Sequence, residues 1–327
     1  MRYVWQAKQW QQLWQSIQAG RLPHALLLTG MAGTGKVSFA LHAAQALLCQ
    51  ANTADGDPCN NCHACRLVVT TAHPNVYHVL PEKEGQAIKV DQIRAAAEFV
   101  QQSSMKGEFR IVIIRPAHSM NMNAANALLK TLEEPSSGAI IILVTEQSGR
   151  LPATIRSRCQ RILFPRPNQQ EALSWLRTQP VVESLTPEQS LRLMHGAPLL
   201  AASLSGDDML PLRKEMFQAF SELAKKRAHA LTLAAKWHKI DTVKWLDLLL
   251  GWVSDLLRLQ KGCQPGQLLN QDYTDALQAC APLVPLQKNL QLMEHILTLR
   301  GQISAGINFN KQLLIESLLI RWSEPVT

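Results

Sequence analysis

The eight residues from Gly30 to Val37 have the types and spacing of a loop that binds phosphate. Glycines stand at Gly30, Gly33 and Gly35, and a lysine follows at Lys36. An apolar run precedes the loop and an alanine-rich stretch follows it, so the expected setting is strand, loop and helix. In such a loop, backbone N–H groups surround phosphate oxygens, and the helix N-terminus adds its positive dipole end. The pattern predicts a P-loop in which these glycines and Lys36 would contact a nucleotide.

Two features that would bind a divalent cation are missing from the sequence. Val37 stands where a P-loop carries the hydroxyl that holds Mg²⁺, and Ser38 is rotated away by roughly 100° along a helix. A P-loop ATPase also needs Asp-Glu after a second apolar strand, but Ile111–Ile114 is followed by Arg115 and Pro116. We therefore expect no useful ATP hydrolysis. The loop either holds ATP or ADP loosely or serves as structure.

A cysteine cluster follows the predicted P-loop helix. Cys49, Cys59, Cys62 and Cys65 form the pattern C-x9-C-x2-C-x2-C, which suits tetrahedral zinc because two C-x2-C thiolates can reach one ion from a tight turn. His63 could replace one ligand, and four free thiols in a loop are the plain alternative. Four protein ligands close a zinc site, so a structural role is favoured over catalysis. A zinc module for nucleic acid is disfavoured, because no Lys, Arg or aromatic residue lies between Cys49 and Cys65.

A third candidate site is Ser157-Arg158-Cys159, which follows a predicted helical turn at 151–155. Arginine is always charged and presents a planar fork of donors. Placed at a neighbouring subunit's γ-phosphate, such a residue can raise the rate by roughly 10³–10⁵. The plain alternative is an arginine that is solvated in a surface turn.

The elements that position these residues alternate between strands and helices over residues 1–165. That alternation is typical of a doubly wound α/β domain, and continuous apolar runs such as Ile111–Ile114 are typical of buried parallel strands. Beyond Phe164 the sequence predicts short helices, and from Asp207 onward helices alone. The expected strands lie at 25–28, 75–80, 110–115 and 139–144, and the expected helices at 5–19, 38–48, from Asp91, and at 121–133, 212–225, 243–259, 286–300 and 311–322.

Size and composition are those of a globular protein with two or three domains. The chain has 327 residues, with 46% hydrophobic and 18% charged residues and a net charge of +8, which allows nucleic acid as a partner without requiring it. There is no run of 18 apolar residues and no apolar signal-peptide core, so we expect no membrane span and a cytoplasmic location. Clustered cysteines in an odd total of seven favour a reducing compartment with a metal site.

These motifs together carry a resemblance to a known family. The segment Asn123–Pro135, reading NAANALLKTLEEP, closely resembles the central helix of bacterial clamp-loader AAA+ subunits. Ser157–Cys159 resembles their Ser-Arg-Cys motif, and the cysteine spacing resembles their zinc module. His24 before the P-loop strand and the segment Asn308–Trp322 also fit the family. The resemblance spans the whole chain.

The departures from the family pattern separate two kinds of subunit. The ATP-hydrolysing gamma/tau motors carry Gly-Lys-Thr, Asp-Glu and a sensor arginine after Gly-Ser. Here the corresponding positions read Lys36-Val37, Arg115-Pro116 and Gly196-Ala197-Pro198-Leu199, while Arg158 is kept. This combination is similar to the non-motor delta-prime family. A gamma/tau-like motor ATPase with degenerate metal ligands is the alternative.

The resemblance implies a stator-like subunit of the DNA polymerase III clamp loader, with Arg158 acting as an arginine finger in trans. It implies an AAA+ α/β domain at 1–165 with a zinc insertion at 49–75, a small helical lid domain at 166–206 and a helical collar domain at 207–327. The implied partners are gamma/tau and delta subunits, the sliding clamp and primed DNA. Because basic side chains neutralise phosphates, Lys130 or Arg115 are candidate DNA contacts. The implied assembly is a DNA-directed DNA polymerase, a nucleotidyltransferase, in which this chain has no ATPase of its own.

Overall fold

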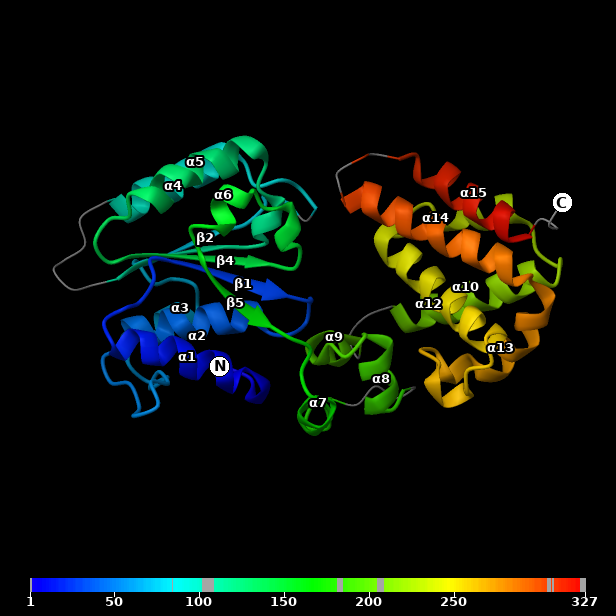
Figure 1. Ribbon diagram of the computed structural model, residues 1–327, viewed down its shortest axis with the longest axis horizontal. Coiled ribbons are helices and arrows are strands. Elements are labelled where there is room, and N and C mark those ends of the chain that lie inside the picture. The colour runs from blue at the N-terminus through cyan, green and yellow to red at the C-terminus, as the bar shows by residue number, and fades with distance from the viewer. Residues whose placement is uncertain are drawn as a thin grey trace. The chain divides into compact units, whose positions relative to one another are not determined.

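The computed structural model describes residues 2–83, 85–101, 109–180, 185–204, 209–304, 307 and 309–323. The chain forms two compact units (Figure 1). Unit 1 comprises Met1–Gln179 with Gly196–Leu200, and unit 2 comprises Pro180–His195 with Ala201–Thr327. The predicted boundary between residues 206 and 207, and Asn308, lie outside the described residues, and the three-domain division stays a prediction.

Unit 1 is built on a parallel sheet of five strands in the order β2-β3-β4-β1-β5. The continuous apolar runs form the strands with the most buried residues, as the sequence predicts. The fifth strand, Gln160–Phe164, was not predicted, because only Ile162 and Phe164 of its five side chains are buried. The strands are β1 (Ala25–Gly30), β2 (Val76–Val79), β3 (Arg110–Ile114), β4 (Ala139–Thr145) and β5 (Gln160–Phe164).

Helices cover both faces of this sheet (Figure 1). Successive residues of a strand point to opposite faces, so Ile141 and Leu143 of β4 pack in the core beneath α4 and α5, while Ile140 and Ile142 pack with α1 and α2. The helical elements of unit 1 are η1 (Val4–Gln6), α1 (Ala7–Gln18), α2 (Lys36–Leu48), α3 (His63–Val69), α4 (Val90–Gln101), η2 (Ala117–Ser119), α5 (Met122–Glu133), η3 (Ser148–Arg150), α6 (Ala153–Arg156) and α7 (Gln169–Leu176).

Two local predictions in unit 1 need correction. The insertion at 49–75 is not wholly irregular, because α3 (His63–Val69) forms inside it with the Cys62 sulfur accepting from the Cys65 N–H at its start. α4 begins at Val90, one residue before its predicted start at Asp91. The Asp91 carboxylate lies in the first turn, where the helix dipole favours a negative charge.

Unit 2 is helical throughout its described residues. Its apolar core gathers four tryptophans, Trp237, Trp245, Trp252 and Trp322. The helix predicted to end at Arg300 continues to Ser304. The elements are α8 (Pro187–Leu193), α10 (Met209–Ala224), α11 (Ala230–Trp237), α12 (Thr242–Gln260), η5 (Pro265–Gln267), η6 (Gln271–Tyr273), α13 (Thr274–Cys280), η7 (Ala281–Leu283), α14 (Leu286–Ser304) and α15 (Lys311–Ser323), while α9 (Pro198–Ser203) spans the boundary between the units.

Candidate functional site

The P-loop has the predicted strand, loop and helix setting. β1 ends at Gly30, and α2 begins at Lys36 directly after Gly35, whose φ of 86° lies in the left-handed region that favours glycine. A Cβ on Gly35 would lie 2.6 Å from Tyr3 and Gln6, and a Cβ on Gly33 would lie 2.7 Å from Leu200. The loop is therefore tightly covered by other parts of unit 1.

Lys36 is already neutralised inside the protein. Its side chain is only 3% exposed, and its Nζ donates to the Met31 carbonyl at 2.7 Å and pairs with Glu146 Oε1 at 3.0 Å. A bound phosphate would bring a second negative charge next to the Glu146 carboxylate, and the two like charges would repel each other. Glu146 is thus the protein's own anion beside Lys36 at the P-loop.

The N-terminal segment hydrogen-bonds to the carbonyls of the loop. Gln6 Nε2 donates to the carbonyls of Thr34 and Gly35, each at 2.9 Å, and Trp5 Nε1 donates to the Thr34 carbonyl at 3.1 Å. From the other side, the Leu199 N–H donates to the Gly33 carbonyl at 3.2 Å. These bonds fix the loop without a nucleotide.

The hydroxyl that would directly follow Lys36 and the Asp-Glu pair that would follow β3 are replaced by Val37 and by Arg115-Pro116. Val37 is half-buried and packs on the apolar core of unit 1. Arg115 follows β3. Burial lowers the pKa of His78 on the neighbouring strand, and the positive charge of Arg115 lowers it further. His118 shares a hydrogen bond with Thr145 Oγ1 at 3.0 Å, and burial lowers its pKa.

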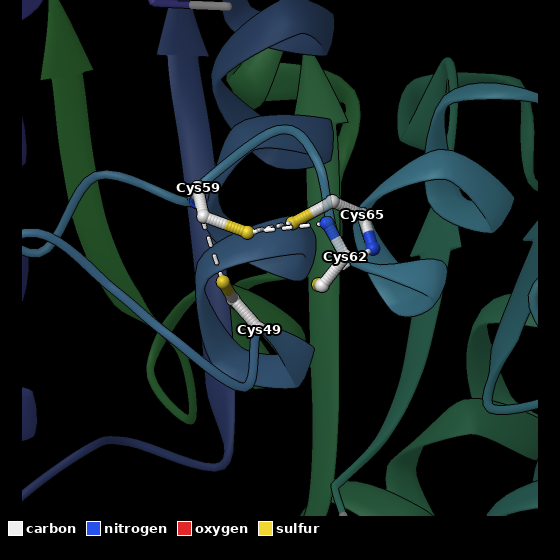
Figure 2. A group of neighbouring side chains, drawn as sticks. All are labelled: Cys49, Cys59, Cys62 and Cys65. Carbon is white, nitrogen blue, oxygen red and sulfur yellow. Dashed lines mark hydrogen bonds between the residues drawn. The ribbon is translucent and has the colours of Figure 1, made fainter.

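The four predicted zinc ligands come together. The sulfur atoms of Cys49, Cys59, Cys62 and Cys65 lie within 4.8 Å of one another and face a common space (Figure 2). The Cys59 and Cys65 sulfurs are 3.9 Å apart, which matches the spacing of about 3.8 Å that a tetrahedron with Zn–S bonds of about 2.3 Å requires. His63 is exposed and lies outside the group of four, so its alternative role as a ligand is not supported.

The electrostatics of the cluster suit a cation. Backbone N–H groups of Gln50 and Cys65 lower the pKa of Cys62 to about 6, so this sulfur is a thiolate at neutral pH. Burial raises the pKa of the Cys65 thiol, and a metal would supply the positive charge that stabilises its thiolate. All seven cysteines are free of disulfides. The donor set therefore fits a four-sulfur metal site.

The cysteine-bearing insertion is anchored to the P-loop side of unit 1. Asp57 accepts from Arg2 at 2.8 and 3.0 Å and contacts His42 Nε2 of α2 at 2.9 Å. The hydrogen bond from Arg2 is the main reason that the pKa of Asp57 is lowered, while burial lowers that of His42. Since α2 also runs from Lys36 to Leu48, directly before Cys49, one helix joins the P-loop to the cysteine cluster.

Arg158 lies at the opposite end of the strands from Lys36. It precedes β5, whose first residue Gln160 is level with Leu26 of β1, whereas the last pair is Gly30 with Phe164. Four residues of strand span about 13 Å, so Arg158 cannot contact a phosphate bound at its own P-loop. Its side chain is 36% exposed and pairs with Glu133 Oε1 through Nη2 at 2.6 Å.

Comparison with curated proteins identifies the family. The chain is 35% identical to DNA polymerase III subunit delta' of Pseudomonas aeruginosa over 322 residues, which covers 98% of this chain and 97% of the relative. This chain belongs to the delta' family of DNA polymerase III subunits. The delta' subunit of Escherichia coli is 30% identical and is covered to 94%. Family models described as "DNA polymerase III, delta subunit" and its C-terminal part match residues 5–168 and 207–324.

A subunit named tau is also similar to this delta' family member, over a shorter stretch. DNA polymerase III subunit tau of Bacillus subtilis is 32% identical over 201 residues, which is 62% of this chain and 34% of tau. The predicted fold class is confirmed: an AAA+ α/β domain with a P-loop is followed by short helices and an all-α C-terminal domain. In the described residues, no helix is long and apolar enough to cross a membrane.

The delta' sequence predicted some neighbours and not others. The four cysteines meet, and the glycines of the loop surround the start of α2, as their local spacing requires. Glu146 was not predicted, although it directly follows β4, which pairs with β1 in the sheet. Parallel α/β sheets bind ligands at the carboxyl ends of their strands. The place of Glu146 directly after β4 was therefore the available signal.

Proposed function

We propose that this chain is the non-motor, stator-like subunit of a DNA polymerase III clamp loader, which helps to load the sliding clamp onto primed DNA. The observation that carries the proposal is the contrast between Lys36, buried and paired with Glu146, and Arg158, exposed at the other end of the strands. The first arrangement disfavours nucleotide in the chain's own P-loop. The second leaves a guanidinium available to a neighbouring subunit.

Arg158 acts in trans in this proposal. Its distance from its own P-loop along β1 and β5 argues against action in cis. Its guanidinium has five N–H donors, and its contacts are one hydrogen bond, to Thr154, and one ion pair, with Glu133. A charged donor placed at a developing phosphate charge stabilises the transition state of phosphoryl transfer. Arg158 would thus complete the ATP site of a gamma/tau neighbour.

The remaining partners follow from family membership and charge. The delta' chain would assemble with gamma/tau and delta subunits through the helical collar at 207–327, next to the lid at 166–206, and would act in the cytoplasm. Its net charge of +8 suits contact with primed DNA within the assembly. Lys130 is exposed on α5 and Arg115 is half-buried, so Lys130 is the better placed of the two predicted DNA contacts.

Zinc is the metal that the cysteine cluster would hold. Cys49, Cys59, Cys62 and Cys65 would supply four thiolates, and Cys62 already has a lowered pKa. Four protein ligands leave no open coordination position, so the ion would stabilise the insertion at 49–75 and take no part in catalysis.

The second candidate function is a gamma/tau-like motor ATPase with unusual metal ligands. It is favoured by the kept residues Gly30, Gly33, Gly35 and Lys36 and by the similarity to tau of Bacillus subtilis. Hydrolysis of ATP by the isolated chain, lost on Lys36→Ala, would support this candidate against the stator.

Assembly tests the proposed function as a whole. Purified chain mixed with motor and delta subunits should form one complex whose measured mass includes this chain, while the isolated chain should hydrolyse no ATP above a protein-free blank. A chain that stays outside the complex, or that turns over ATP by itself, would contradict the proposal.

A further inference from the structure

Two segments that the sequence analysis treated separately meet in one ion pair. Glu133 is the last residue of α5, within the stretch that resembles the central helix, and Arg158 lies between α6 and β5. Glu133 Oε1 and Arg158 Nη2 are 2.6 Å apart. The residues are 25 positions apart in the sequence, so the pair depends on the folded unit.

The guanidinium of Arg158 is held at a second point. Its Nη1 donates to the Thr154 carbonyl, which belongs to α6, at 3.0 Å. The ion pair with Glu133 and the hydrogen bond to Thr154 hold two different nitrogens of this guanidinium, which is a rigid plane. The other N–H groups are not used by these two acceptors, and 36% of the side chain is exposed.

The backbones beneath the pair are fixed by burial. Leu132, Ile155 and Cys159 lie in one buried core, adjacent in sequence to the residues of the pair or within three positions of them. His24, just before β1, contacts the Leu132 carbonyl through Nε2 at 3.1 Å and so secures the end of α5. Close packing leaves such positions little freedom. The flexible part of Arg158 is therefore its own side chain.

We propose that Glu133 is a positioning residue for Arg158: it orients the guanidinium so that the unused donors face the phosphate of a neighbouring subunit. This inference rests on the proposed function of Arg158. Small misplacements of a group that stabilises a transition state cost large factors in rate, whereas an exposed ion pair by itself stabilises a fold very little. The carboxylate of Glu133 thus has more effect on geometry than on folding.

The test uses the reconstituted clamp-loader complex and its ATP turnover in the presence of clamp and primed DNA. Arg158→Ala should lower kcat, and Glu133→Ala should cause at least about half of that loss in kcat. KM for ATP should change by less than about twofold in Glu133→Ala. Glu134→Ala, which removes the adjacent exposed carboxylate, is the matched control and should match the wild type. The double variant Glu133→Ala with Arg158→Ala should be no slower than Arg158→Ala alone, because both changes act through one group.

A charge swap separates positioning from simple stabilisation. Glu133→Arg with Arg158→Glu restores an ion pair but moves the guanidinium onto α5, so turnover should stay as low as in Arg158→Ala. Recovery of turnover by the swap, or equal turnover in Glu133→Ala and Glu134→Ala, would overturn the role of Glu133. If Arg158→Ala itself has no effect, the proposed finger fails, and this inference fails with it.

Discussion

Each end of the sheet in unit 1 carries a cation paired with a carboxylate, and the two pairs differ in exposure. At the carboxyl ends of the strands, Lys36 and Glu146 are paired with the lysine 3% exposed. At the amino ends, Arg158 and Glu133 are paired with side chains 36% and 49% exposed. The lysine of the first pair is buried beside the P-loop, whereas both side chains of the second pair are exposed.

The difference bears on the proposal that this chain keeps the P-loop fold while its contribution to hydrolysis comes from Arg158. In the interior, separating Lys36 from Glu146 leaves a buried charge without its partner, which is costly. On the surface, the exposed pair stabilises the fold by only about 0–1 kcal/mol, and Arg158 keeps donors that Glu133 does not use. In the proposed function, the P-loop serves as scaffold and Arg158 acts on nucleotide that a neighbouring subunit holds.

Among the changes that test this comparison, loss of the metal should have the largest effect on stability. Removing zinc with a chelator, or changing Cys62→Ser with Cys65→Ser, should lower the unfolding midpoint by on the order of 10 °C, because structural zinc binding contributes directly to folding. Since α2 joins the cysteine cluster to Lys36, amide exchange should rise at the P-loop more than at α6. Metal analysis of the wild type should give about one ion per chain.

A metal-free wild type that is fully folded would contradict the zinc assignment. Cys263→Ser, which removes a half-buried cysteine of unit 2 outside the cluster, is the matched control and should keep both the ion and the midpoint.

Removal of the two carboxylates compares the pairs directly. Glu146→Ala should reduce the free energy of unfolding by roughly 2–4 kcal/mol, because Lys36 stays buried with only the Met31 carbonyl as acceptor. Glu133→Ala should reduce it by less than about 1 kcal/mol. Urea unfolding of both variants beside the wild type measures the two changes.

Equal losses of stability in Glu146→Ala and Glu133→Ala would remove the distinction between the two ends of the sheet.

Lys36→Met extends the test, since it removes the buried charge and leaves Glu146 partly exposed. We expect Lys36→Met to cost less than Glu146→Ala, because a carboxylate that is a third exposed can be hydrated.

Local sequence patterns predicted the parts of this structure that local physics determines. Strands β3 and β4 are continuous apolar runs, and the cysteine spacing alone brings four sulfurs to one loop and one short helix. β5 was missed because an edge strand with two buried residues gives a weak signal. The pairs Lys36–Glu146 and Arg158–Glu133 could not be predicted, since their partners come from elements far apart in the sequence.

ATP turnover of the reconstituted complex containing Arg158→Ala tests the central claim most directly. The matched control is Arg156→Ala, which removes an exposed arginine two residues away in α6. The stator proposal predicts that the Arg158→Ala complex assembles normally but loses clamp- and DNA-dependent turnover at the neighbouring site by a factor of at least about 10², while the Arg156→Ala complex matches the wild type. Unchanged turnover with Arg158→Ala would contradict the proposal that this chain completes a neighbour's ATP site.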